Sequence, residues 1–405
     1  MDEPVDGFAG GSRSSSLWTE VVVRPGTRPA SRGGAGRLGV EHALDGARAG
    51  LTFTRDSPVS IDGMPAPFIP SYVLDALAEH GDDRVTQAAS RTLALDEAFR
   101  AARERSLVVP AQTVGTPGSP DRTIRDAGNV ETTEGEVVRA EGDDPTGDAA
   151  ADEAYDGLGA TYDLFWSVFE RDSIDGRGLP LQGVVHYGQD YDNAFWDGTQ
   201  MVFGDGDGVI FNRFTIAVDV IGHELAHGVT EIEAGLVYRD QSGALNESVS
   251  DCFGSMVKQH ALGQTAEGAD WLIGAGLLAE GVNGVALRSM RAPGTAYDDE
   301  RLGGKDPQPA HFDDYVTTSD DDGGVHINSG IPNRAFYLAA VALGGNSWDQ
   351  AGPIWYATLQ DDKLRSDSTF AAFAALTVAA AARLYDDAVS AAVRNAWEQV
   401  GVDAG

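Results

Sequence analysis

The sequence predicts an α+β fold with two lobes, a strand-rich lobe followed by a mainly helical one. Runs typical of short strands occur in the first half, at residues 136–139, 184–187 and 200–203. From residue 219 onward, apolar residues instead recur at the spacing of one helix face. The helical stretches predicted there are 218–229, 246–262, 331–343 and 370–400. Strands followed by helices, rather than alternating with them, are typical of α+β chains.

The composition excludes several classes of partner. The 405 residues suffice for two domains with additional segments. Their formal net charge of −34 would repel nucleic-acid phosphates and anionic membrane surfaces, so we expect neither as a partner. The longest apolar stretch, residues 370–384, is too short to cross a bilayer. A single cysteine, Cys252, excludes an internal disulfide.

The first 110 residues are predicted to differ from the rest. Residues 1–65 are rich in Gly, Arg, Ser and Pro, and we expect a poorly ordered extension. They lack the apolar core of a secretory signal peptide, so we expect a cytoplasmic protein or one exported without such a signal. Residues 66–110 predict a helical hairpin, with a first helix of about ten residues and a second from about 83 to 103. This hairpin is too small to fold well alone and should dock on the rest of the chain.

A histidine pair carries the first chemical signal. His223 and His227 lie four residues apart in a helical pattern, which places both imidazoles on one face within reach of one zinc ion. Glu224 lies beside them, where it can take a proton from a metal-bound water. The alternative is an amphipathic helix that happens to carry two histidines. We expect this zinc helix to end the strand-rich lobe, residues 111–228, and to precede the helical lobe, residues 229–405.

A second predicted helix supplies the missing ligand. Glu247 can complete a set of three zinc ligands and leave the fourth position open, as a catalytic zinc site requires. Asp251 follows one turn later on the same face, so it and Asn246 are candidates for orienting the zinc-bound imidazoles. The alternative is a solvated acidic face, but the apolar neighbours Leu245 and Val249 favour burial.

With these motifs in order, the chain resembles the thermolysin family of zinc peptidases from about residue 122 to 402. Nineteen residues separate His227 from Glu247, as in that family. Residues 192–196 resemble its substrate-binding edge strand, which implies that Asn193 and the carbonyl of Ala194 hold the substrate as an added strand. Residues 235–238 and 287–290 resemble the segments that carry an oxyanion-stabilising tyrosine, here Tyr238, and a carbonyl-binding arginine, here Arg288.

The resemblance also implies a mechanism. Residues 321–330 look like the family's segment with a second oxyanion-stabilising residue, here His326, oriented by Asp321. One zinc ion would polarise a water and the scissile carbonyl while Glu224 moves the proton. The implied protein is a monomeric endopeptidase that acts on peptides or proteins. It would cut on the amino side of bulky hydrophobic residues, because the pocket positions are all apolar: Phe214, Val220, Leu277 and Leu287.

One feature of the well-known family members is expected to be lost. They carry a double calcium site, and its first acidic ligand is retained here as Asp219, with Asp270 also present. Other ligand positions hold residues without carboxylates: Lys258, Leu272 and Ala275. The resemblance therefore predicts that no calcium pair binds there. We hypothesise that the ammonium group of Lys258 takes its place and pairs with Asp219 and Asp270.

The helical hairpin has a resemblance of its own. Residues 69–74 and 90–93 look like the short propeptide of protealysin-like enzymes, although Ser71 stands where that subgroup usually has a second proline. The implied protein is a zymogen, in which residues 66–110 act as an intramolecular inhibitor until the chain is cut between about 103 and 122.

Two other functions compete with this interpretation. A zinc protein that only binds peptides is disfavoured because the set Glu224, Tyr238 and His326 is complete. An aminopeptidase is disfavoured by the nineteen-residue spacing and by the lack of a recognisable motif for a free amino terminus.

Overall fold

The structure is a computed structural model that describes residues 67–103 and 116–405. The predicted poorly ordered extension, residues 1–65, and most of the predicted cleavage region lie outside the described residues.

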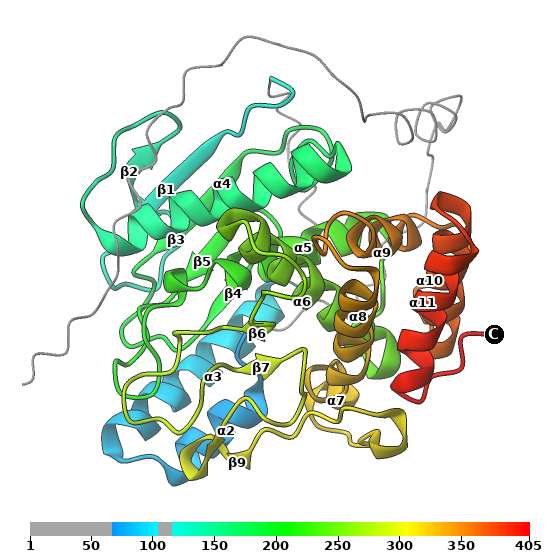
Figure 1. The fold of residues 1–405 in the computed structure, drawn as a ribbon. Helices are drawn as coiled ribbons and strands as arrows, with labels where there is room; N and C mark the ends of the chain where they lie inside the picture. The colour runs from blue at the N-terminus through cyan, green and yellow to red at the C-terminus, as the bar shows by residue number, and fades with distance from the viewer. Residues whose placement is uncertain (1–66, 104–115) are drawn as a thin grey trace, which may run out of the picture. The chain divides into compact units, whose positions relative to one another are not determined.

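A five-stranded sheet forms the first lobe (Figure 1). Its strands lie in the order β2 (Glu136–Ala140), β1 (Arg122–Asp126), β3 (Leu181–Val185), β5 (Met201–Phe203) and β4 (Ala194–Trp196). β1, β3 and β5 run parallel, whereas β2 and β4 pair antiparallel to their neighbours. β4 is therefore an edge strand, with one side that pairs with no other strand of the sheet, and such an edge can accept an extended peptide.

Helix α4 (Ala149–Phe169) packs on β1 and β3. The helix begins at Ala149 because the side chain of its N-cap residue, Asp148, accepts from the N–H of Ala151, and the alanine-rich turn that follows favours helix. The helix therefore covers one face of the sheet.

Helices α5 (Val218–Glu233) and α6 (Asp240–Leu262) lie side by side between the sheet and the C-terminal helices (Figure 1). Glycines at their crossing allow a close approach. A Cβ atom on Gly254 would lie 2.2 Å from the backbone oxygen of Asp219, and one on Gly222 would lie 2.9 Å from the side chain of Val257. This contact brings the predicted metal ligands of the two helices together.

The rest of the second lobe is helical, with short strands and 3₁₀ turns between α6 and α7. The helices are α7 (Asp321–Asn328), α8 (Gly330–Leu343), α9 (Ala351–Leu359), α10 (Phe370–Leu384) and α11 (Asp387–Gln399). The short elements are η1 (Phe214–Ile216) before α5, and then β6 (Leu272–Ile273), β7 (Arg288–Ser289), β8 (Asp298–Asp299), η2 (Glu300–Leu302), β9 (Gly304–Lys305) and η3 (Phe312–Asp314). The stacked rings of Trp355 and Trp397 tie α9 to α11.

The prediction of one helix over residues 370–400 is wrong. The chain breaks after Leu384, and the side chain of Asp386 accepts from the N–H groups of Ala388 and Val389 to begin α11. An N-cap aspartate of this kind stabilises a new helix start, which lets α11 turn back along α10.

The predicted helical hairpin is confirmed as α2 (Ser71–His80) and α3 (Asp83–Arg103). It contacts both lobes. α2 packs on η2 of the second lobe, while in α3 the guanidinium of Arg91 donates to the carbonyl of Gln189 in the first lobe (2.8 Å). Within the described parts of the chain, no helix has the length and hydrophobicity needed to cross a membrane.

Candidate active site

The structure brings together three side chains that can hold one metal ion. The Nε2 atoms of His223 and His227 lie 3.0 Å apart, and each is 3.4 Å from a carboxylate oxygen of Glu247. Ligands at about 2.0–2.1 Å from a tetrahedral zinc lie about 3.3 Å from one another. All three side chains are buried, so the triangle that they form has the size and the seclusion of a zinc site.

The protonation states of these residues fit a cation. The Nδ1 atom of His223 lies 2.8 Å from Asp251 Oδ1, and that of His227 lies 2.8 Å from Asn246 Oδ1. An oxygen acceptor places a proton on each Nδ1, so the neutral form of each ring carries its lone pair on Nε2, on the side of Glu247. Burial, the largest factor, lowers the pKa of His227 to about 3 and keeps its ring neutral. Lone pairs and a carboxylate converging in a buried space require a positive ion, and this donor set suits zinc.

Asp251 joins the metal ligands to the surrounding structure. Its carboxylate accepts from Arg288 Nε (2.9 Å) and Nη2 (2.8 Å) and from Asn333 Nδ2 (2.8 Å), in addition to His223. Burial alone would raise the pKa of Asp251, but Arg288 and His223 lower it well below the usual range. The aspartate is therefore a fixed anion that orients His223.

Glu224 is positioned next to the metal ligands by the edge strand. Its side chain is 1% exposed, and its Oε2 accepts the backbone N–H of Trp196 in β4 at 3.0 Å. This bond fixes the carboxylate where the cleft meets the metal site, as a general base requires.

Tyr238 and His326 lie together on the other side of Glu247. The Tyr238 hydroxyl donates to Glu247 Oε1 and lies 3.2 Å from His326 Nε2, and Asp321 Oδ1 lies 2.6 Å from His326 Nδ1. Burial alone would lower the pKa of His326, but the carboxylates of Glu247 and Asp321 raise it above its ordinary value. The raised pKa favours the imidazolium form of His326, and its Nε2 lies next to the Tyr238 hydroxyl, whose hydrogen is directed to Glu247 in the structure. Two such donor groups side by side are what an oxyanion needs for its stabilisation.

An unusual backbone holds His326 in place. Asp321, Asp322, Gly323 and Gly324 have positive φ angles of 53°, 51°, 89° and 78°. At Gly323 a side chain is excluded twice, because the backbone is left-handed and a Cβ atom would lie 2.2 Å from Asp240 Oδ1. The tight turn lets Asp321 accept from the N–H of His326 (2.9 Å) as well as from its ring.

The predicted substrate-binding edge, Asn193 and Ala194, is covered by the chain's own residues 68 and 69. The N–H of Phe68 donates to the carbonyl of Ala194 at 3.0 Å. Asn193 makes two bonds to Ile69: its Oδ1 accepts the N–H (2.7 Å) and its Nδ2 donates to the carbonyl (3.2 Å). This edge therefore binds a peptide backbone in the structure itself.

The predicted pocket residues are all buried, and two of them, Leu277 and Leu287, lie with the Phe68 ring around Gly274. A Cβ atom on Gly274 would lie within 3.1–3.5 Å of Leu277, Leu287 and the Phe68 ring. The guanidinium of Arg288 lies 4.5 Å from the centroid of that ring. Phe214 and Val220 belong to the same hydrophobic cluster, and their part in the pocket wall stays a prediction. So does the role of Arg288 in binding a substrate carbonyl.

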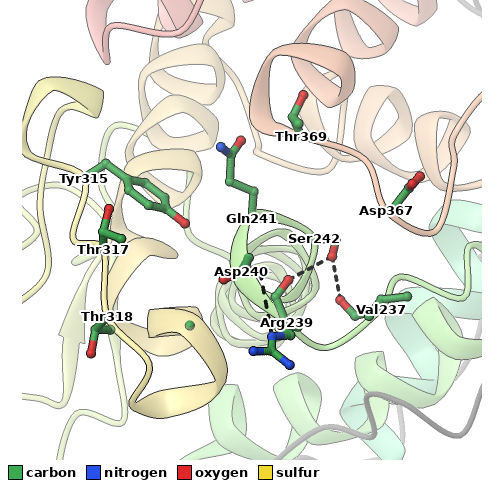
Figure 2. Close-up of a pocket in the computed structure, with 11 residues that line it drawn as sticks. Val237, Arg239, Asp240, Gln241, Ser242, Tyr315, Thr317, Thr318, Asp367 and Thr369 are labelled. Carbon is green, nitrogen blue, oxygen red and sulfur yellow. Dashed lines mark hydrogen bonds and ion pairs between the residues drawn. The ribbon is translucent and has the colours of Figure 1, made fainter.

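Two cavities lie near the site. One of about 200 Å³ is lined by His326, Asp321, Pro67, Ile69 and Asp96, among others. The other, of about 400 Å³, lies at the start of α6, and Figure 2 shows polar side chains such as Gln241, Tyr315 and Thr369 around it. Two of the catalytic candidates, His326 and Asp321, line the smaller cavity, whereas none of them lines the larger one.

At the positions where the sequence predicts that the calcium site is lost, the structure has a buried ammonium group. Lys258 Nζ lies 2.8 Å from Asp219 Oδ2 and 3.0 Å from Asp270 Oδ1, and it donates to the carbonyl of Leu272 at 2.6 Å. The hypothesised pairing with both aspartates is thus confirmed. Ala275 lies in the loop after β6 and brings no charge to the group.

Sequence reasoning missed several contacts that shape the site. Asn333 binds Asp251 from α8, the N–H of Trp196 holds Glu224, and Phe68 fills the pocket. The first two leave no mark in the sequence because a lone amide and a backbone group follow no motif. The position of Phe68, directly before the propeptide-like segment, is the one signal that could have indicated the third.

Comparison with known proteins agrees with this geometry. Residues 111–231 match the family model described as thermolysin metallopeptidase, catalytic domain, and residues 234–402 match the model of its alpha-helical domain. An extracellular metalloprotease of Pectobacterium carotovorum is 56% identical over 83% of this chain and 96% of its own. A thermolysin of Alicyclobacillus acidocaldarius is 42% identical over 63% of this chain and 46% of its own.

A solved structure is similar over the hairpin as well. It is the precursor of protealysin, a metalloproteinase from Serratia proteamaculans, with 57% identity and a TM-score of 0.78. The match covers 84% of this chain and 100% of that one. Two consecutive family models match, and the Pectobacterium protease and the protealysin precursor are matched over 96% and 100% of their own chains, so the chain belongs to the thermolysin family of metallopeptidases, in its protealysin-like branch.

Proposed function

We propose that the chain is the inactive precursor of a zinc-dependent neutral endopeptidase, and that the mature enzyme cuts on the amino side of bulky hydrophobic residues. The observation that carries this proposal is the convergence of two imidazole lone pairs and the Glu247 carboxylate in a buried space beside Glu224. The relatives named above are metalloproteases, and one solved relative is a precursor.

The chain's own residues supply the acid–base chemistry. Zinc held by His223, His227 and Glu247 would polarise the scissile carbonyl and lower the pKa of a water molecule. Glu224, fixed by the N–H of Trp196, takes a proton from the attacking water and delivers it to the leaving amine. Tyr238 and His326 donate to the oxygen that gains negative charge, a contribution of about 3 kcal/mol per donor.

The specificity proposal rests on the pocket that Phe68 fills. Its wall is aliphatic at Leu277 and Leu287 and opens beside the metal ligand His223, whose ring lies edge-on to Phe68 at 5.3 Å between centroids. A bulky apolar side chain buried there is favoured by the hydrophobic effect. We therefore expect Phe and Leu at the position after the scissile bond.

The role of the hairpin as an intramolecular inhibitor is supported by what it covers. Residues 68 and 69 take up the hydrogen-bonding groups of Asn193 and Ala194. The ring of Phe99 from α3 also lies against the ring of Phe195 in the edge strand, with 4.1 Å between the ring centroids. A substrate and the hairpin need the same hydrogen-bonding groups, so they exclude each other.

We also propose that Lys258 makes calcium unnecessary at this corner of the fold. A single ammonium group already pairs with the two aspartates, and a cation in the same place would meet its repulsion. Removing calcium from the zinc-loaded protein is expected to leave the melting temperature unchanged. A fall of many degrees would contradict the proposal.

The test of the function is hydrolysis of a peptide that is blocked at both ends and contains Gly-Leu or Gly-Phe. The zinc-loaded chain is first cut within residues 104–115 by a site-specific protease, and Glu224→Ala is treated identically. We expect cleavage between the two residues by the wild type and a loss of several orders of magnitude in the variant. No cleavage by a folded, zinc-loaded wild type would instead favour a protein that only binds peptides. Hydrolysis confined to peptides with a free amino terminus would indicate an aminopeptidase.

A further inference from the structure

The segment before α2 binds the cleft in one defined direction. The N–H of Phe68 donates to Ala194, and both polar groups of Ile69 bond to the side chain of Asn193. These three bonds fix the order of the residues along the edge strand. Phe68 comes first, with its side chain in the apolar pocket beside His223, and Ile69 comes next, at the side chain of Asn193.

Pro67 precedes Phe68 in this direction along the edge strand. It is buried and, together with Ile69, lines the cavity that also contains His326 and Asp321. In the proposed enzyme, the pocket beside His223 takes the side chain that follows the bond to be cut. The bond that occupies this place in the precursor is therefore the one between Pro67 and Phe68.

We propose that residues 67–69 occupy the cleft as a substrate would, with the Pro67–Phe68 bond in the position of the bond to be cut, and that Pro67 is what keeps this bond intact. The proposal rests on the proposed endopeptidase function. In this proposal, Pro67 makes the segment an inhibitor instead of a substrate, and Phe68 anchors the segment in the specificity pocket.

The chemistry of proline gives the physical reason. Its ring fixes φ near −65° and removes the N–H group, so the residue before the bond can neither donate to an edge strand nor turn freely to present its carbonyl. Attack by water requires the carbonyl carbon to become tetrahedral while it is held among the catalytic groups. A residue with one backbone torsion locked and one hydrogen bond missing cannot follow this change as an ordinary residue does.

The rest of the hairpin keeps this segment in register. Asp96 of α3 is 3% exposed, and its Oδ2 accepts from Asn193 Nδ2 at 2.9 Å. The hydroxyl of Thr92 accepts the N–H of Asp192 at 3.0 Å, next to the same asparagine. α3 therefore holds Asn193 in the orientation in which it bonds to both polar groups of Ile69, and a shift of the segment by one residue would break those bonds.

The test uses the full-length zinc-loaded chain with Pro67→Ala. The variant is incubated alone, and the products are identified by intact mass and by sequencing of new amino termini. We expect a fragment that begins at Phe68, formed at least about tenfold faster than from the wild type. The reaction should be first-order and independent of protein concentration, because the segment is already bound to its own cleft. Pro70→Ala is the matched control, since it removes a nearby proline that does not precede the bond, and it should produce no such fragment.

Two further variants keep the result interpretable. Pro67→Ala combined with Glu224→Ala should abolish the cut at Phe68, which excludes a contaminating protease. Phe68→Asp places a charge in the apolar pocket, so it should release the segment and raise activity on the blocked peptide without a cut at residue 68. A melting temperature for each variant confirms that it is folded.

The proposal is overturned if Pro67→Ala is cut at Phe68 no faster than the wild type, or if both are cut rapidly there, while the same preparation hydrolyses the blocked peptide once residues 104–115 are cleaved. If the folded, zinc-loaded and cleaved wild type does not hydrolyse the blocked peptide, the endopeptidase function itself fails. The two failures are therefore distinguishable in one set of preparations.

Discussion

The Nδ1 atom of His223 lies 2.8 Å from Oδ1 of Asp251, in a pair of which neither side chain is more than 1% exposed. The same carboxylate oxygen accepts from Arg288, which also lies over the ring of Phe68. Asp251 thus connects His223 to the arginine that covers the Phe68 ring. A carboxylate in this position fixes the ring of a metal-binding histidine and raises its basicity.

Asp251→Asn is therefore expected to weaken zinc binding by about 10–100-fold. The amide still has an oxygen for one donor, but it loses the charge that pairs with Arg288. Zinc affinity is measured by competition with a chelator of known affinity. Asp313→Asn, which changes an exposed acid, serves as the control and should bind zinc like the wild type. An unchanged affinity in Asp251→Asn would mean that Asn333 and the backbone orient His223 without the charge.

Removal of the buried ammonium group is expected to destabilise the fold. In Lys258→Met, Asp219 stays buried at 1% exposure without its cationic partner, and breaking such a pair costs about 3–5 kcal/mol. Denaturant unfolding of the zinc-loaded protein measures the change in the free energy of unfolding. The double variant Lys258→Met with Asp219→Asn should recover most of the loss. If the single variant unfolds like the wild type, the pair contributes no net stability.

The metal ligands and Glu224 were predictable because they follow local periodicity. Residues four apart on a helix share a face whatever the rest of the fold does, and α5 and α6 place these side chains as their spacing requires. The edge strand at Asn193 was predicted only through the family resemblance. Its occupation by Phe68 depends on a contact between residues 126 positions apart, which no local pattern encodes.

The errors in the predicted elements also have physical causes. The apolar pattern of residues 370–400 continues across the break at Asp386, so periodicity alone indicates one helix, and the capping side chain was overlooked. α6 was expected near residue 246 but begins at Asp240, because its polar first turn carries no apolar signal. The first error follows from reading hydrophobic periodicity ahead of capping chemistry, whereas α6 begins without a capping side chain that could have marked its start.

Loss of a protonated donor is expected to lower turnover more than substrate binding. His326→Ala removes one of two donors to the oxyanion, so kcat should fall by about 10²–10³-fold with a small change in KM. Tyr238→Phe should act in the same way. Steady-state kinetics on the blocked peptide, with the linker-cleaved protein, separate the two constants. A rise in KM with unchanged kcat would show that His326 binds the substrate and does not stabilise the charge that develops during the reaction.

The binding of the hairpin to the rest of the protein is expected to weaken as the pH rises towards 7. Burial raises the pKa of Asp96 to about 7 despite bonds from Tyr191 and Asn193 and the charge of Arg100, whereas a released aspartate has its ordinary value near 4. Between about pH 4 and pH 7, docking of the hairpin is therefore coupled to the uptake of a proton by Asp96. The contribution of Asp96 to docking is complete below about pH 4, declines between pH 4 and 7 and is lowest above pH 7. Hydrogen exchange of α3 amides in Glu224→Ala, corrected for intrinsic rates, should therefore accelerate from pH 5 to 8. Adding Asp96→Asn should remove that acceleration, and an equal pH response in both proteins would assign it to another group.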